Sequence, residues 1–294
     1  MDGFAGYHPL VNFIYFLLLL LFAMFSIHPF FLAVGFFSGF LYSCMLEGKR
    51  AVKRNLAFAI PVILLGMICN PLFTQRGATI LFYLNDAAVT AEALCYGCAA
   101  AVLLSGMFIW IQCMAKVMST DKLICLFGRV APAAGLLLSI SLRFIPLLKL
   151  RFSQVQEGQR CMGQIHEKGH LLHNLRILGK ELSILIAWSL EAGIETSDSM
   201  EARGYGLKGR SSYTIYRFER RDGILLILLL CLSAVLFAGC LSGVNTILYY
   251  PVIVFPKQGG LGYAAEGAYL LLCLLPVLIE LIGEWKWKYL YSNM

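Results

Sequence analysis

The chain has 294 residues, of which 59% are hydrophobic and 14% are charged, and its formal net charge is +7. Soluble domains carry roughly 25% charged residues, and a mean hydropathy of +0.75 leaves too few polar side chains to cover a water-exposed surface. The composition therefore excludes an ordinary soluble domain and predicts a polytopic membrane protein with the lipid bilayer as its main partner. Because basic residues set the orientation of membrane proteins, we interpret the positive charge as a topology signal and expect no nucleic-acid partner.

Four apolar stretches occupy the first 118 residues and predict four transmembrane helices. They cover residues 10–27, 30–46, 56–73 and 88–118. His28-Pro29 separates the first two, since proline disfavours helical geometry in the residue before it. The fourth stretch exceeds the about 20 residues that a bilayer requires, so we expect it to tilt or to extend beyond the membrane.

From residue 119 to residue 222 the chain mixes apolar stretches with charge. Arg143, Lys149 and Arg151 interrupt an otherwise apolar run, and each would cost about 2.5–3.5 kcal/mol at the centre of a bilayer. This region therefore predicts amphipathic helices at or below the membrane interface. Between residues 180 and 195, four apolar side chains share one helix face; they are Leu182, Leu185, Ile186 and Leu190.

Two further apolar stretches, residues 223–241 and 267–283, complete the predicted fold. We expect an all-α, polytopic membrane helical bundle with about five or six transmembrane helices and cytoplasmic amphipathic helices. The predicted regions are N-terminal transmembrane helices (1–118), cytoplasmic or interfacial helices (119–222) and C-terminal transmembrane helices (223–294). With both termini inside, every lysine and arginine except Arg76 and Lys257 lies on the cytoplasmic side, in agreement with the positive-inside rule.

The stretch from Gly204 to Gly209 matches the pattern G-x-G-x-x-G, which indicates dinucleotide binding only where a strand precedes it and a helix follows. A charged helical segment precedes it here, so we predict a helix end at which glycine supplies a left-handed cap. The phosphate-binding pattern G-x-x-x-x-G-K-S/T is absent from the sequence. If the protein takes part in ATP-driven work, another subunit must therefore hydrolyse the ATP.

Two groups of potential metal ligands occur in the sequence. One combines three histidines and an acid, with Lys168 among them: His166, Glu167, His170 and His173. Its spacing does not meet the zinc pattern H-E-x-x-H, and we interpret it as a solvated helix face. The other is the C-x-x-C of Cys95 and Cys98 inside a predicted span, where metal or redox use would need a second pair and polar access. We expect helix packing there, and neither a metal nor another cofactor.

Other features of the predicted spans concern packing or isolated charge. Gly35 and Gly39 form a small-x-x-x-small pattern, which favours a close helix contact. Glu92 and Glu280 are isolated acids near the ends of predicted spans. An acid inside a membrane is a functional candidate by default, although a position near the end of a span weakens that interpretation.

The stretch Ala202-Arg203-Gly204, with Tyr205-Gly206 after it, resembles a signature motif of the transmembrane T component of energy-coupling factor (ECF) transporters, the CbiQ/EcfT family. His8-Pro9 ahead of the first predicted span is also similar, as is the layout of four spans followed by a long basic region. The segment Leu142-Arg143-Phe144-Ile145-Pro146 is similar to the entry of the family's first coupling helix. The resemblance covers nearly the whole chain.

The family carries a second Ala-Arg-Gly at the end of its first coupling helix, where this chain has Cys161, Met162 and Gly163. Arg160 lies two residues before Met162, roughly 200° around a helix, and so cannot simply replace the missing arginine. The resemblance thus implies an asymmetric pair of contacts, which would suit two non-identical ATPases.

The resemblance implies a non-catalytic coupling subunit that crosses a bacterial cell membrane several times. It would join two ABC-type ATPase subunits to a small membrane S component that captures a vitamin or a metal ion. The residues implied to contact the ATPases are Arg160, Cys161, Met162, Gly163, Ala202, Arg203 and Gly204.

A self-contained secondary transporter or channel is the main alternative, and it would need intramembrane ion-pathway charges or inverted repeats. We find no internal repeat, and the charges concentrate outside the predicted spans. A membrane-embedded enzyme is a further alternative, but it would need a convergent set of catalytic side chains that the predicted spans do not carry.

Overall fold

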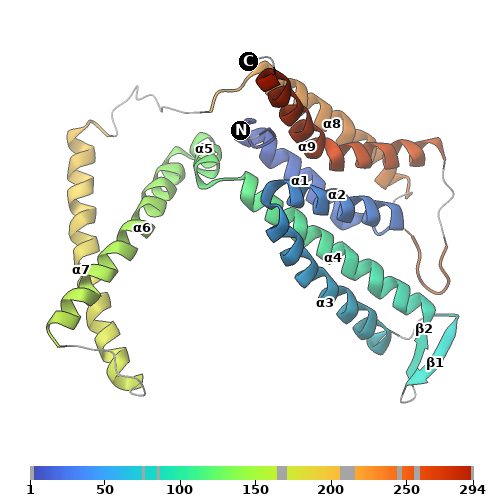
Figure 1. Ribbon diagram of the computed structural model, residues 1–294, viewed down its shortest axis with the longest axis horizontal. Helices are drawn as coiled ribbons and strands as arrows, with labels where there is room; N and C mark the ends of the chain where they lie inside the picture. The colour runs from blue at the N-terminus through green and yellow to red at the C-terminus, as the bar shows by residue number, and fades with distance from the viewer. Residues whose placement is uncertain are drawn as a thin grey trace. The chain divides into compact units, whose positions relative to one another are not determined.

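The computed structural model describes residues 3–74, 77–84, 87–163, 171–205, 216–243, 247–254 and 259–292 (Figure 1). Within these residues the chain forms nine helices and one two-stranded antiparallel hairpin. The helices are α1 (Pro9–Phe25), α2 (Pro29–Glu47), α3 (Lys49–Phe73), α4 (Ala91–Val117), α5 (Thr120–Val130), α6 (Pro132–Cys161), α7 (Leu171–Ala202), α8 (Arg220–Leu241) and α9 (Gly260–Ser292), and the strands are β1 (Ile80–Leu84) and β2 (Ala87–Thr90). The all-α prediction is confirmed.

The chain divides into two compact units. The first combines Met1–Leu123 with Tyr216–Met294, and the second consists of Ile124–Ile215. We call the first the membrane unit, because it contains α1 to α4, α8 and α9, and the second the α6–α7 unit. The assignment of residues 119–222 to the cytoplasmic side of the bilayer stays a prediction.

Six of the described helices are long and apolar enough to cross a membrane: α2, α3, α4, α6, α8 and α9. This confirms a multi-pass membrane protein, but the set of spans differs from the predicted one at one member. α1 has 17 residues, which is at the lower limit for crossing a bilayer. α6, which we did not predict as a span, is long and apolar enough to cross a membrane. Arg143 and Lys149 of α6 are exposed, and an interfacial position for that helix stays a prediction.

The first two helices begin in the same way, at a His-Pro pair. The Nδ1 atom of His8 accepts a hydrogen bond from the Leu10 N–H at 3.2 Å, and that of His28 accepts one from the Phe30 N–H at 3.3 Å. Proline occupies the first helical position in both cases, where its missing N–H leaves no bond unmade. The prediction that His28-Pro29 separates the first two helices is confirmed.

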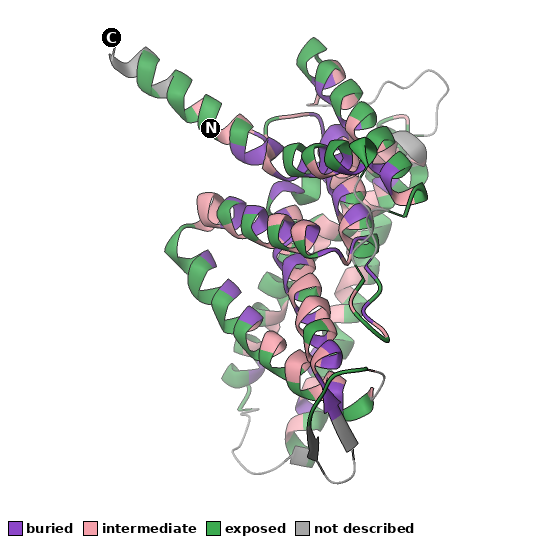
Figure 2. Ribbon diagram, turned by 90° about the vertical axis from the view of Figure 1, so that its right-hand side faces the viewer, coloured by how far each residue is buried: buried purple, intermediate pink, exposed green. Residues whose placement is uncertain are grey.

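Aromatic side chains fill the core of the membrane unit. Phe4, Tyr15 and Trp110 are at most 1% exposed, and the rings of Phe4 and Tyr15 meet edge to face with centroids 5.0 Å apart. Because lipid offers no hydrogen-bond partners, the polar atoms of these rings bond within the protein. Tyr15 Oη donates to the Leu272 carbonyl at 3.1 Å, and Trp110 Nε1 donates to the Gly35 carbonyl at 2.9 Å. Buried positions accordingly form stripes along the long helices (Figure 2).

The glycine pair of α2 is a contact point for two of these rings. A Cβ atom added to Gly35 would lie 2.8 Å from Tyr269 Oη, and one added to Gly39 would lie 2.8 Å from Trp110 Nε1. The predicted close contact is therefore confirmed, with aromatic side chains of α4 and α9 as the partners of the two glycines.

α3 and α4 lie side by side (Figure 1) and approach closely at a second glycine pair, Gly66 and Gly97. A Cβ atom on Gly66 would lie 2.6 Å from the Cβ of Ala101, and one on Gly97 would collide with the carbonyl oxygen of Gly66. Gly97 lies within the C-x-x-C sequence, whose Cys95 is exposed and whose Cys98 is half-buried, both as free thiols. The residue of this motif that the helix contact requires is therefore the glycine.

The end of the membrane unit that carries the β1–β2 hairpin is closed by polar side chains. Glu92, in the first turn of α4, accepts a hydrogen bond from the Thr79 N–H at 3.2 Å, so this isolated acid holds the hairpin against the start of the helix. Tyr249 Oη donates to the Ile27 carbonyl at 3.0 Å, which ties the segment after α8 to the turn between α1 and α2.

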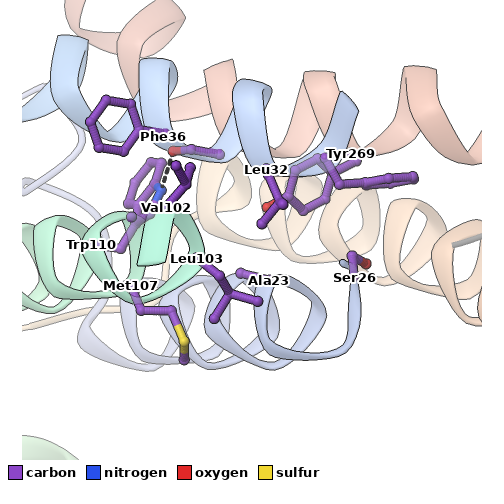
Figure 3. Close-up of a pocket in the computed structure, with 12 residues that line it drawn as sticks. Ala23, Ser26, Leu32, Phe36, Val102, Leu103, Met107, Trp110 and Tyr269 are labelled. Carbon is purple, nitrogen blue, oxygen red and sulfur yellow. Dashed lines mark hydrogen bonds between the residues drawn. The ribbon is translucent and has the colours of Figure 1, made fainter. Parts of the chain in front are cut away.

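A small cavity of about 20 Å³ lies between α1, α2, α4 and α9 (Figure 3). Phe36, Trp110 and Tyr269 line it, and its volume is close to that of a single water molecule. Gly106 borders the cavity, and a Cβ atom added there would come no closer than 3.8 Å to any neighbouring atom. The packing around Gly106 thus has room for a methyl group, unlike the packing around Gly97.

We expect the same substitution to act in opposite directions at these two glycines of α4. Gly97→Ala should destabilise the membrane unit by about 1–3 kcal/mol through overpacking, whereas Gly106→Ala should be neutral or stabilising by up to about 1 kcal/mol because alanine favours helix over glycine. The thermal unfolding midpoint of the purified protein in detergent measures both effects. Equal shifts for the two variants would contradict the packing described.

Candidate functional site

The C-terminal end of α7 carries the arginine of the Ala-Arg-Gly motif. The helix ends at Ala202, and Gly204 has a φ of 75°, a left-handed conformation that glycine adopts without strain. The Tyr205 N–H donates to the Met200 carbonyl at 3.0 Å and the Gly204 N–H donates to the Glu201 carbonyl at 2.9 Å. These two bonds form a Schellman cap. The predicted glycine cap is confirmed, and the remainder of the glycine-rich stretch, residues 206–209, lies outside the described residues.

The C-terminal end of α6 has the same local geometry. The helix ends at Cys161, Met162 is its capping residue, and Gly163 has a φ of 79°. The Gly163 N–H donates to the Arg160 carbonyl at 3.0 Å, which is the equivalent of the bond that Gly204 makes. Met162 and Arg203 therefore occupy the same position, between the last helical residue and a left-handed glycine.

Both helix ends are open to solvent in the α6–α7 unit. Met162 is 67% exposed, and Arg160, Cys161, Ala202 and Arg203 are exposed as well. α6 and α7 cross while running in opposite senses, so that the two C-terminal ends lie apart (Figure 1). The structure thus presents two separate helix ends, each with a left-handed glycine after the capping residue. Only the end of α7 has an arginine at the capping position, where the carbonyl end of the helix dipole favours a cation.

Polar contacts hold α6 against α7 where the helices cross. The guanidinium group of Arg151 lies 4.6 Å from the ring centroid of Trp188, within the range of a cation–π contact. The side chain of Gln156 donates to the carboxylate of Glu181 at 3.5 Å, and Glu181 is 1% exposed. These pairs were not predicted from the sequence. The apolar stripe predicted on α7 does not include these residues, and the sequence alone does not show which face of α6 contacts α7.

The apolar stripe of α7 remains largely uncovered within this unit. Leu182, Ile186 and Leu190 are 48%, 59% and 66% exposed, whereas Leu185 is half-buried. Ile194, at 65% exposure, continues the stripe by one further turn. Four large apolar side chains at intervals of four residues thus form an exposed ridge along α7, which we call the α7 ridge.

The residues considered as metal ligands do not form a described site. His166, Glu167 and His170 lie outside the described residues, and His173 is exposed on α7. Within the described parts of the chain, no group of three or more His, Cys, Asp or Glu side chains is arranged to hold a metal ion.

No family model matches the chain. It is similar in sequence to several curated bacterial proteins that share the name energy-coupling factor transporter transmembrane protein EcfT. The protein of Streptococcus thermophilus is 33% identical over 122 residues, which are 41% of this chain and 46% of that relative. The chain is thus similar to the EcfT transmembrane proteins over part of their length.

Two other relatives match over a longer region. The EcfT of Streptococcus equi is 27% identical over 193 residues, 60% of this chain and 70% of its own length. The EcfT of Bacillus selenitireducens is 27% identical over 197 residues, 63% of this chain and 73% of its own length. The match to the Streptococcus thermophilus EcfT spans less than half of that protein. Together with the membrane-crossing helices, these matches confirm the resemblance and a multi-pass protein of the bacterial cell membrane.

The cap of α7 can be tested directly by substitution. Gly204→Ala should fray the last turn of α7, because an L-residue in the left-handed conformation costs about 1–2 kcal/mol. Gly193→Ala is the matched control, since Gly193 lies inside α7 with open space around it and alanine there should strengthen the helix. Amide hydrogen exchange of residues 196–205 measures the effect, and unchanged protection in Gly204→Ala would contradict the cap.

Proposed function

We propose that this EcfT relative is the transmembrane coupling subunit of an ECF-type importer. In this proposal it transmits the ATP-driven motion of two ABC-type ATPase subunits to a small S component that binds a vitamin or a metal ion. The observation that carries the proposal is the pair of exposed helix ends with the same glycine cap, one holding Met162 and the other Arg203, on a chain related to EcfT.

The chemistry of the α7 end suits an acidic partner surface. An arginine guanidinium is always charged and offers a planar fork that binds carboxylates in a bidentate manner. Gly204 makes the chain turn sharply away after Arg203, so no side chain of the next residue shields the guanidinium from a partner. A methionine at the equivalent place on α6 offers only apolar contact, and the two ATPase contacts are therefore unequal.

The acids of α7 support a role for this helix beyond its own stability. Four exposed acids lie toward the end of the helix: Glu191, Glu195, Asp198 and Glu201. Glu201 lies in the last turn, where the dipole favours cations instead, so it weakens the isolated helix slightly, as expected where surface chemistry serves a partner. The α7 ridge supplies apolar area on the same helix, and we assign it to the S component, because such ridges dock into apolar grooves.

The membrane unit supports a coupling role over transport by the chain alone. The cavity of Figure 3 holds about 20 Å³ and is lined mainly by apolar and aromatic side chains, so it is too small to hold a vitamin-sized solute. Glu92 and Glu280 both accept hydrogen bonds from backbone N–H groups, so we assign both acids a structural role.

We expect Arg203→Ala to reduce substrate uptake and coupled ATP hydrolysis in the assembled transporter. Loss of a hydrogen bond to a charged group costs about 1.5–3 kcal/mol, so affinity for the ATPase at this end should fall roughly tenfold or more. Membrane insertion should not change, because Arg203 is exposed and supports no core contact. Normal uptake by Arg203→Ala would remove this residue from the mechanism.

Two substitutions at Met162 serve as matched controls on the equivalent helix end. Met162→Ala should reduce uptake less than Arg203→Ala does, since it removes no charge. Met162→Arg restores an arginine at the second capping position and should keep or strengthen ATPase binding. Transport by the purified chain without any ATPase would instead favour a self-contained transporter.

A further inference from the structure

Three charged side chains from three different elements converge on the backbone of residues 3–8, which we call the N-terminal segment. Glu280 of α9 accepts a hydrogen bond from the Phe4 N–H at 3.1 Å. Lys122 of α5 donates to the Ala5 carbonyl at 2.6 Å. Asp222 of α8 accepts from the His8 N–H at 3.1 Å. The two acids thus accept hydrogen bonds from backbone N–H groups of this segment, and the lysine donates one to a backbone carbonyl.

Two of these anchors stand where the chain leaves the membrane unit and where it returns. Lys122 is next to Leu123, the last residue of the membrane unit before the α6–α7 unit, and Asp222 follows soon after Tyr216, the first residue on the return. We call these two places the exit and the return. Both are bonded to the same short segment of backbone, although the two anchors are a hundred residues apart in the sequence.

Each anchor also bonds to a neighbouring helix end. Lys122 donates a second bond to the Val117 carbonyl at 2.8 Å, at the C-terminal end of α4. The other carboxylate oxygen of Asp222 accepts from the Glu219 N–H at 2.9 Å, which forms a capping box at the start of α8. The N-terminal segment is therefore fastened to the end of one spanning helix and to the start of another.

Ring contacts reinforce the attachment at the return. The imidazole of His8 meets the ring of Phe218 with centroids 5.4 Å apart, and the guanidinium of Arg221 lies 5.4 Å from the ring centroid of Tyr7. The returning chain therefore lies along the N-terminal segment over several residues, and the attachment does not depend on one hydrogen bond.

Both anchor side chains are buried, so their hydrogen bonds must compensate for the loss of water around a charged group. Lys122 is 5% exposed and Asp222 is 1% exposed. Removing a charge from water costs several kcal/mol unless strong hydrogen bonds replace the water, and a single Ser or Thr would cap a helix at far lower cost. The hydrogen bonds of these charged groups are therefore strong and directional. A point that transmits force requires attachments of this kind.

We propose that the N-terminal segment locks the exit and the return into one rigid base, with Lys122 and Asp222 as positioning residues. Motion that arrives at the exit or at the return then acts on both places together. The mechanical role rests on the proposed coupling function, whereas the lock itself is a property of the chain alone.

Amide hydrogen exchange of the full-length protein in detergent tests the lock. Lys122→Met should raise exchange about tenfold at residues 3–12, the factor expected from losing one hydrogen bond to a charged group, and also at residues 216–224. Lys122→Arg should restore protection at both places. Lys116→Met is the control, because Lys116, near the end of α4, pairs with Glu47 of α2 at 3.0 Å but has a side chain that is 60% exposed. A response of Lys122→Met confined to residues 117–123 would overturn the proposal.

Asp222→Asn provides the converse measurement and covers the case in which Lys122→Met does not fold. It removes the charge while keeping the size of the side chain, and it should raise exchange at residues 3–12 and also at residues 117–123 on the other side. The double variant should then show less than the sum of the two single effects, as residues that share a partner do. Additive effects confined to each variant's own neighbourhood would overturn the lock.

The mechanical role needs a readout that a purely structural role would not change. In the assembled transporter, Lys122→Met should leave ATPase binding intact but reduce the substrate taken up per ATP hydrolysed, and Lys122→Arg should restore that ratio. An unchanged ratio would overturn the mechanical role. If exchange shows the lock while Arg203→Ala transports normally, the lock stands and the proposed coupling function fails.

Discussion

Lipid supplies no hydrogen bonds, so buried polar groups of the membrane unit are stabilised by partners within the protein. This constraint accounts for the positions of the buried polar side chains. Trp110 and Tyr15 reach backbone carbonyls of α2 and α9 across the core, and two histidines cap the first two helices. The glycines of α2 contribute to these contacts, because without side chains they let the aromatic rings approach the helix backbone closely.

The α6–α7 unit follows a different logic. Its few buried contacts lie at the crossing, where Glu181 and Ile177 are almost fully covered, and most of its apolar area is uncovered. A helical pair that leaves this much apolar surface exposed does not complete its own core, and a membrane surface or partner subunits must cover it. The helix ends add capped, exposed tips to that open surface. The two units thus differ: the membrane unit has a buried aromatic core of its own, whereas the α6–α7 unit leaves most of its apolar area exposed.

Local signals in the sequence predicted local structure well. The left-handed cap at Gly204 and the break at His28-Pro29 depend on neighbouring residues alone, and both were found as expected. The burial of Lys122 was not foreseeable in the same way, because a lysine after Ser-Thr-Asp has every sign of a surface residue. Its partner is the carbonyl of Ala5, more than a hundred residues away. The same holds for Asp222 and Glu280, whose partners are backbone atoms that carry no sequence signal. α6 was ambiguous for another reason: its apolar length suits a span while its charges suit the interface.

The central claim is that the tip of α7 docks onto a separate ATP-hydrolysing protein. A photo-crosslinking amino acid placed at position 203 tests it most directly, in native membranes and with mass spectrometry of the product. The account predicts a crosslink to an ABC-type ATPase, and a second, unequal one from position 162. Crosslinks to lipid alone, or to proteins without any nucleotide-hydrolysing subunit among them, would contradict it.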